Sequence, residues 1–429
     1  MVPELQVWLY AHRAGTLALV DGQLSFSYAP EWLSWPGATA LSLSLPLQAQ
    51  PFDDPQTRPF FAGLLPEGPA RRMIALRNDL ALLAHLGSEG AGAVALLEAG
   101  QDLPAPVPGP GVRWLSDEEV AALLDKLPHC PLPTGKDRLP VVFDGARIGL
   151  PLGDTPSSHL LRPALPAVEH SVANAGFCMA LAQVMGLRPA QAEIRSVLGR
   201  PFLLIERYDR VVDASGRRRR LHQEDFCQAL GVLPAMKYEH EGGPGLARCF
   251  DLLRRATRPM RPQILRLFDD VVFNALIGNH VVHAGNFSLL YAEQTPVPAG
   301  PVLAGPVPAG PIMAPLDTIW STAVYPALAS KMAMKIGSTY RFCEIQACDW
   351  EQFAEDVGFS WAQSRERILE LAESLPPAAR RLRAVPGRGY SGNEVVEQII
   401  ALIEQRCALT LRRLTGANAH PGAATQASA

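Results

Sequence analysis

The sequence predicts an α+β protein with a small β-rich beginning and a mainly helical second half. Residues 4–28 alternate between apolar and polar side chains as two strands, and Asp21-Gly22 is a turn signal in their connection. Residues 202–210, FLLIERYDR, form a buried strand with a polar end. From residue 350 onward, two long segments place apolar residues at intervals of three and four, which is typical of helices. Strands early in the chain and helices late in it indicate the α+β class.

Composition is that of an ordinary globular protein. The 429 residues provide core for two to three domains, with 48% hydrophobic and 19% charged residues. A formal net charge of −3 gives no general attraction for nucleic acid, so we expect no direct nucleic-acid contact except through a partner. No apolar run reaches the roughly 18 residues that span a membrane. The seven cysteines are scattered without CxxC pairs, which indicates a reducing, cytoplasmic location.

Local signals mark a boundary and an insertion. The proline-rich residues 101–113 form a linker, after which Ser116 is the N-cap of a helix and Glu119 completes a capping box. Residues 296–315 repeat Pro, Ala and Gly and cannot form a packed core. We expect this insertion to lie on the surface as a tether.

Two further segments receive specific predictions. The helix predicted at 171–187 buries a face formed by Phe177, Leu181 and Val184. The four arginines at 217–220 are expected at the solvated tip of a hairpin.

The acidic residues Glu224 and Asp225 follow Gln223 at the start of a helix. Two carboxylates side by side could serve as an acid and base pair. Capping of the helix N-terminus and complementing its dipole is the better explanation.

The stretch at 277–291, IGNHVVHAGNFSLLY, is the centre of the functional argument. An apolar, helix-like run ends at Gly278, a polar turn carries His280, His283 and Asn286, and an apolar strand follows. A polar turn between buried elements is where chemistry usually lies. In kinases the corresponding loop supplies an Asp that orients the acceptor hydroxyl and an Asn that holds Mg²⁺.

This stretch resembles the catalytic loop of the HipA family, bacterial serine/threonine kinases that are the toxin half of toxin–antitoxin pairs. The family pattern is approximately G-N-x-D-x-H-x-K-N-x-S, and the matching residues are Gly278, Asn279, His283, Asn286 and Ser288. The catalytic Asp of the pattern falls on Val281 and its Lys on Gly285. Further similar motifs are LLPEG at 64–68, QEDFCQ at 223–228 and KYEHEGGPG at 237–245.

The resemblance implies a HipA-like, kinase-related fold in four parts. They are an N-terminal subdomain at 1–104, a nucleotide lobe with a sheet at 105–210, a mainly helical lobe at 211–416 with the insertion at 295–315, and a disordered tail at 417–429.

The resemblance also implies where a nucleotide would bind. The backbone of Glu206 and Tyr208 would meet the adenine, and Arg162 stands where the family has a phosphate-binding Lys. Asn286 would bind the metal, and the second metal ligand, an Asp, falls on Thr318. Because side chains alternate along an extended backbone, Asp317 is expected to point away from the phosphates unless the insertion lets the segment slip, in which case Asp317 is a candidate metal ligand.

Two more positions depart from the family: its phosphorylatable serine falls on Pro131, and an acid on the helix after the phosphate-binding strand falls on Ala175. With Arg162, Val281 and Thr318, these changes predict a pseudokinase that acts by binding a HipB-like helix-turn-helix antitoxin or a related kinase subunit. ATP and Mg²⁺ are expected only if activity remains.

Two alternatives stay open. The first is an active serine/threonine kinase in which His280, His283 or Asp317 substitutes for the missing groups and the target is a translation factor such as an aminoacyl-tRNA synthetase. In the second, His280 and His283 bind a metal, although HxxH supplies only two of the four ligands that a closed zinc site requires.

Overall fold

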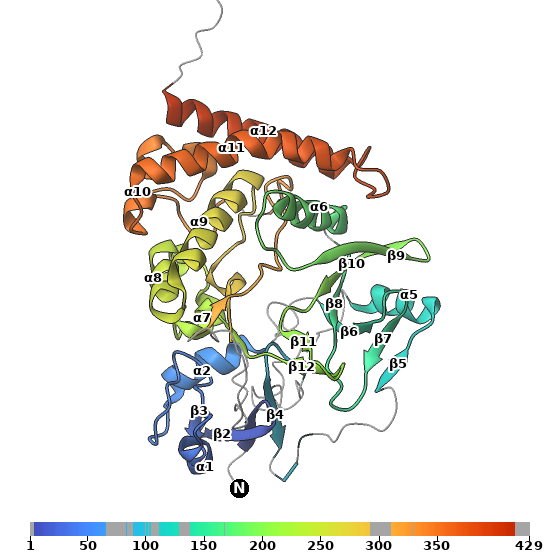
Figure 1. Cartoon of the computed structure of the whole chain (residues 1–429), viewed down its shortest axis with the longest axis vertical. Coiled ribbons are helices and arrows are strands. Elements are labelled where there is room, and N and C mark those ends of the chain that lie inside the picture. The colour runs from blue at the N-terminus through green and yellow to red at the C-terminus, as the bar shows by residue number, and fades with distance from the viewer. Residues whose placement is uncertain are drawn as a thin grey trace, which may run out of the picture.

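The structure is a computed structural model of the 429-residue chain (Figure 1). The described residues are 4–65, 83, 89–98, 100, 101, 103, 111–127, 138–166, 168–291, 310–328 and 330–416. The predictions for Pro131, for most of the LLPEG motif and for the tail from 417 lie outside these residues.

The N-terminal part is an antiparallel sheet with strand order β3-β2-β1-β4. Its elements are β1 (Glu4–Leu9), β2 (His12–Val20), β3 (Gln23–Tyr28), α1 (Pro30–Ser34), α2 (Asp54–Gly63) and β4 (Val94–Glu98). The two strands predicted in residues 4–28 are β1 and β3, but the segment taken as their connection contains a third, longer strand, β2. Strand β2 pairs with β1 on one side and β3 on the other, and Asp21-Gly22 is the turn between β2 and β3.

A second, six-stranded sheet has the order β5-β7-β6-β8-β10-β9. Its elements are β5 (Val112–Trp114), α5 (Asp117–Lys126), β6 (Leu139–Phe143), β7 (Ile148–Pro151), β8 (His159–Pro163), α6 (Ser171–Val184), β9 (Ala192–Val197) and β10 (Arg200–Glu206). The predicted capping box of Ser116 and Glu119 begins α5. Along β10, Phe202 and Leu204 pack in the cluster that includes α5, whereas Leu203 and Ile205 pack in the cluster that includes α6. The sheet is therefore covered on both faces.

The remaining part of the chain is mainly helical. Its longer helices are α8 (Leu246–Ala256), α9 (Met260–Ile277), α10 (Ala347–Asp356), α11 (Trp361–Arg383) and α12 (Glu394–Thr415). Its short elements are β11 (Arg210–Val212), β12 (Arg218–Arg220), β13 (Gln223–Asp225), α7 (Phe226–Ala229), β14 (Ser288–Leu290) and β15 (Ile312–Met313). Helix α9 runs through the centre of this part and is packed by α8, α11 and α12 (Figure 1).

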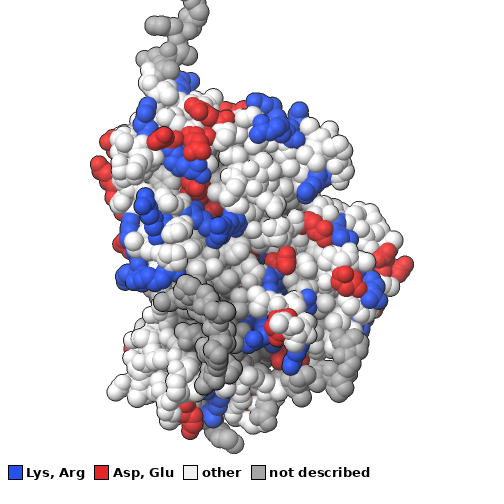
Figure 2. Space-filling model, viewed as in Figure 1, with Lys and Arg blue, Asp and Glu red and all other residues white. Residues whose placement is uncertain are grey.

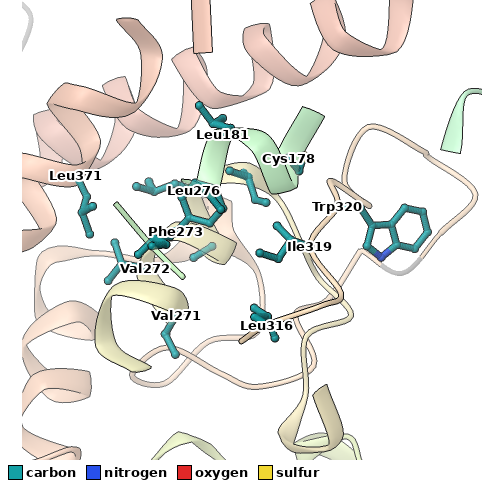
Figure 3. Close-up of a cluster of buried hydrophobic side chains, with 14 of the residues drawn as sticks. Cys178, Leu181, Val271, Val272, Phe273, Leu276, Leu316, Ile319, Trp320 and Leu371 are labelled. Atoms are coloured by element: carbon teal, nitrogen blue, oxygen red, sulfur yellow. The ribbon is translucent and has the colours of Figure 1, made fainter. Parts of the chain in front are cut away.

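The core around α9 joins the helical part to the segment that follows β15. Figure 3 shows Val271, Val272, Phe273 and Leu276 of α9 together with Leu316 and Ile319 from that segment and Cys178 and Leu181 from α6. Leu276 and Leu181 are completely buried. This packing fixes the end of α9, from which the polar turn at 278–286 leaves.

Three predictions on individual segments need correction. Val184 was expected on the buried face of α6 but is 54% exposed, because it is the last residue of the helix. The end of the insertion is not a surface tether, since Ile312–Met313 form β15, which pairs with β14, and Met313 is buried. The arginines at 217–220 do belong to a hairpin, but Arg220 is not solvated and forms ion pairs with Glu89 and Asp154.

Basic and acidic side chains are interspersed over the face shown in Figure 2, as the small net charge suggests. None of the helices that the structure describes is both long and apolar enough to cross a membrane.

Candidate functional site

The turn at 278–286 is held against the segment that follows β15. Gly278 ends α9 in the left-handed conformation at φ +79°, and a Cβ there would come within 2.8 Å of side chains of Ala323 and Leu402. Its carbonyl oxygen accepts hydrogen bonds from the backbone N–H groups of Thr322 and Ala323, both at 3.0 Å. Glycine at this position thus allows two distant segments to meet.

Side-chain amides continue this connection. The Nδ2 of Asn279 donates to Asn274 Oδ1 at 2.8 Å and to the carbonyl of Thr318 at 3.2 Å. Asn286 closes the turn, since its Oδ1 accepts from the backbone N–H of His283 at 3.0 Å. Val281 is half-buried and packs against the core of the helical part. Asn279 therefore joins the turn to the backbone of Thr318. Val281, Asn286 and Thr318 are not among the described residues that line the cavity between the three parts of the chain.

A cavity of roughly 890 Å³, partly open to solvent, lies where the three parts of the chain meet. All three parts of the chain contribute lining residues. From the N-terminal part they are Gly63, Leu64, Leu65, Gly90 and Ala91, and from the second sheet and its end they are Arg138, Leu160 and residues 205–209. From the helical part they are residues 223–225, Gln228, Gly285, Ser288 and Asp317. Glu206 and Tyr208, predicted at the adenine end, are both lining residues. The Tyr208 hydroxyl donates to Gln223 Oε1 at 2.6 Å, which fixes this side of the cavity.

Asp317 lines this cavity in an ion pair with Arg138. One guanidinium nitrogen of Arg138 lies 2.6 Å from Asp317 Oδ2, and the other donates to Thr318 Oγ1 at 2.8 Å. Thr318 in turn donates to Asp317 Oδ1 at 2.9 Å. Asp317 was expected to point away from the phosphates unless the segment slipped, and the structure places it on the lining of this cavity. Strand β15 ends at Met313, and it is Leu316 that turns into the core, so Asp317 faces the cavity.

Arg138 was missed in the sequence, although a signal was present. The signal is a cation that stands directly before the apolar strand β6. Arg138 is 4% exposed. A buried cation at this position is compensated by Asp317, which sequence alignment alone could not pair with it.

The two histidines that were candidates for a catalytic base, His280 and His283, lie outside the first cavity. His280 lines a second cavity on the helical part, where its Nε2 lies 2.8 Å from a guanidinium nitrogen of Arg406. Because a guanidinium only donates, this Nε2 accepts a hydrogen bond and the ring is neutral. The His283 ring is buried edge-on against Tyr238, with ring centroids 5.4 Å apart. Neither histidine is among the described residues that line the first cavity.

The remaining predicted site residues are on the sheet and its covering helix. Arg162 on β8 is half-buried, and its guanidinium carbon lies 5.5 Å from the centre of the Trp320 ring. Ala175 is 1% exposed in the core of α6. Within the described part of the lining, the cavity includes Leu160 of β8 but not Arg162.

A buried ionic cluster fastens the turn at 89–92 to the end of β10. Arg207 contacts both carboxylate oxygens of Asp209 at 2.8 and 2.9 Å and donates to the carbonyl of Gly90 at 2.9 Å. Arg210 donates to the carbonyl of Gly92 at 3.0 Å. Burial opposes ionisation of Asp209, but the two arginines outweigh it and hold its pKa below the ordinary value. The turn at 89–92 is thus docked onto residues 207–210 at the end of β10.

The acidic pair at the start of α7 has two separate roles. Asp225 is the N-cap of α7 and forms a capping box with Gln228, as predicted. Glu224 is instead buried against the N-terminal part, where it accepts from the Ser42 hydroxyl, the Tyr291 hydroxyl and the backbone N–H of Leu43. Burial raises the pKa of Glu224 to about 7, although these hydrogen bonds oppose the shift.

The two predicted metal-binding side chains that the structure describes, Asp317 and Asn286, already have protein partners. No group of three or more His, Cys, Asp or Glu in the described part of the chain is arranged to hold a metal ion, which also leaves the HxxH metal hypothesis without support. Asp317 is paired with Arg138, and Asn286 Oδ1 is used by the loop backbone.

The six-stranded sheet lies to the lower right of the helical part in Figure 1, and residues 205–209 at the end of β10 line the cavity where the parts of the chain meet. This arrangement is that of a kinase-like protein. The chain belongs to the HipA family: residues 136–379 match the HipA-like C-terminal domain and residues 5–97 match the HipA N-terminal domain.

Individual relatives agree with this assignment. The putative kinase Y4mE of Sinorhizobium fredii is 39% identical over 380 residues, which cover 84% of this chain and 87% of the relative. The serine/threonine-protein kinase toxin HipA of Shewanella oneidensis is 25% identical over 398 residues, covering 84% and 86%. The solved complex of Shewanella oneidensis HipA with HipB and operator DNA matches 96% of this chain and 97% of that chain at a TM-score of 0.78 and 21% identity, which shows the shared fold.

Proposed function

We propose that this HipA-family chain is a pseudokinase that acts by binding a protein partner. The observation that carries the proposal is the pairing of Asp317 with Arg138 beside a loop whose base position is Val281. An apolar Val281 cannot accept the proton of a substrate hydroxyl, and a paired Asp317 is poorly placed to bind a metal. Phosphoryl transfer depends on positioning and charge stabilisation, so these losses together should reduce its rate by many powers of ten.

Catalysis is tested on the purified full chain with labelled ATP and Mg²⁺. We expect no incorporation of phosphate and no magnesium-dependent rise in melting temperature. A ligand present at a hundred times its Kd stabilises the native state by about 2.7 kcal/mol, so retained nucleotide binding would be visible. A shift without transfer would make the chain a nucleotide-binding pseudokinase. Transfer of phosphate would overturn the proposal.

The partner that we propose is a HipB-like helix-turn-helix antitoxin or a related kinase subunit. The support is the relative solved in complex with HipB and operator DNA, whose fold this chain shares. A tagged chain isolated from its own cells should carry such a protein in stoichiometric amount. Isolation of the chain alone, at protein concentrations that preserve the HipA–HipB complex of a relative, would contradict this partner.

An active serine/threonine kinase, aimed at a translation factor such as an aminoacyl-tRNA synthetase, is the second candidate. It is favoured by the finding that Asp317 lines the same cavity as Glu206 and Tyr208. In that case the unmodified chain transfers phosphate and Asp317→Ala abolishes the transfer. His280→Ala should then have little effect, because His280 lines the other cavity.

A further inference from the structure

The second cavity, on the helical part, has a cationic floor and apolar walls. It has an open volume of roughly 1000 Å³ and is formed by the loop residue His280, by residues between 323 and 343, and by one face of α12. Arg341 and Arg406 are among its lining residues, and no Asp or Glu stands among those that the structure describes. Leu328, Leu402 and Leu409 supply apolar surface. An acid-free cavity with two arginines attracts anions.

Arg406 at the floor is a buried cation with neutral neighbours. It is 8% exposed, donates to the carbonyl of Ala275 at 2.6 Å and to His280 Nε2 at 2.8 Å, and stacks 4.3 Å from the centre of the Phe342 ring. Burial lowers its pKa to about 10, which reflects the cost of holding this charge away from water. Buried arginines are normally compensated by a carboxylate or another anion.

A structural role accounts for only part of this charge. Ala275 lies in the last turn of α9, and a helix C-terminus carries the equivalent of roughly half a negative charge. Arg406 therefore anchors α12 to the end of α9 and still leaves positive charge facing the cavity. Arg341 at the rim is exposed and lies 3.8 Å from Glu344, a distance at which an exposed pair is weak and screened by salt.

We propose that this cavity binds an organic phosphate monoester. The phosphate would lie at Arg406 and Arg341, and the organic group would cover the leucines of the walls. A phosphate dianion matches two guanidinium groups, each of which can donate two parallel hydrogen bonds to phosphate oxygens. This site is separate from the first cavity and does not depend on whether the chain transfers phosphate. It reaches the loop directly, since His280 precedes Val281.

The test is calorimetric titration of the full chain with phenyl phosphate, with phenol and inorganic phosphate as partial ligands. We expect saturable binding of phenyl phosphate and at least tenfold weaker binding of either partial ligand. A peptide bearing phosphoserine distinguishes the source: tighter binding than phenyl phosphate indicates a phosphorylated protein, and weaker binding indicates a small molecule. Absence of saturable binding of both phosphate monoesters would overturn the proposal.

Matched variants locate the binding. Gln405→Glu places an acid on the exposed lining of the cavity and should weaken binding about tenfold, whereas Gln398→Glu on the same helix should not. Arg406→Gln should weaken binding more strongly than Arg412→Gln, an exposed arginine outside the cavity. If Arg406→Gln does not fold, the comparison of Gln405→Glu with Gln398→Glu tests the location of the site. Equal affinities in Gln405→Glu and Gln398→Glu would refute this site.

Discussion

Arg138 and Asp317 are 179 residues apart in the sequence and form a 2.6 Å ion pair in the cavity that the end of β10 also lines. Their side chains are 4% and 11% exposed, so the pair is largely removed from water. The cation compensates an acid next to Thr318, the position at which the family has a metal-binding Asp. This ion pair connects the second sheet to the segment after β15. It also engages the carboxylate of Asp317, which would otherwise be available to a metal ion.

Asp317→Ala should destabilise the chain strongly. Removing one partner of a buried ion pair typically costs about 3–5 kcal/mol. The free energy of unfolding in urea measures the loss. The exposed pair of Arg200 and Asp125 gives the control, since Asp125→Ala should change stability little. The double variant Arg138→Met with Asp317→Leu should recover much of the loss. Equal stability of Asp317→Ala and Asp125→Ala would contradict the buried pair.

Arg207→Gln should release the turn at 89–92 from the end of β10. The variant loses two hydrogen bonds to Asp209 and one to Gly90, and it leaves Asp209 buried with less compensation. We expect a loss of several kcal/mol, about 3–5 by comparison with other broken buried pairs. Hydrogen exchange should show faster exchange of the Gly92 amide, which donates to Asp209 at 2.8 Å. The exposed Arg217→Gln is the control, and similar exchange in both variants would refute the docking role.

Glu224 should make stability fall as the pH rises. Its pKa is raised from 4.5 to about 7 in the folded chain, so folding favours the protonated form. Its contribution is fully present below pH 4.5 and is lost as the pH rises through about 7, by about 3 kcal/mol in total. Glu224→Gln should flatten the melting temperature between pH 5 and 8. Asp270, also raised to about 7 by burial, gives a residual slope in both proteins. An unchanged slope in Glu224→Gln would contradict this account.

The sequence predicted the fold class and the loop well because both depend on local patterns. Capping signals located α5 and α7, and the pattern around Gly278 located the turn after α9, which Asn279 joins to the backbone of Thr318. Side-chain direction beyond a strand end was not predictable in this way. Asp317 was assigned by counting along an extended backbone, but regular pairing stops at Met313, so the rule of alternation no longer applies.

Polar contacts between residues far apart in the sequence were the other feature that the sequence did not predict. The ion pair of Arg138 and the hydrogen bonds of Glu224 to Ser42 join residues about 180 positions apart, and no periodicity in the sequence encodes such pairings. Arg406 is another case, because an arginine on an amphipathic helix normally indicates an exposed position. Only the end of α9 and the ring of His280 explain why it is buried.

Restoring the family's residues at the substituted positions distinguishes two cases: a site that has lost its catalytic groups, and a site in which other residues have replaced them. Val281→Asp alone should not give phosphate transfer, because Thr318 and Arg162 would still replace the metal Asp and the phosphate Lys of the family, and catalytic groups act as a unit. The joint variant Val281→Asp, Thr318→Asp, Arg162→Lys and Ala175→Glu, with serine at 131, is expected to show measurable transfer of labelled phosphate. Its control omits only Val281→Asp and should be inactive. Transfer by Val281→Asp alone would mean that Asp317 already serves the metal despite Arg138, and the site would then be one substitution away from an active kinase.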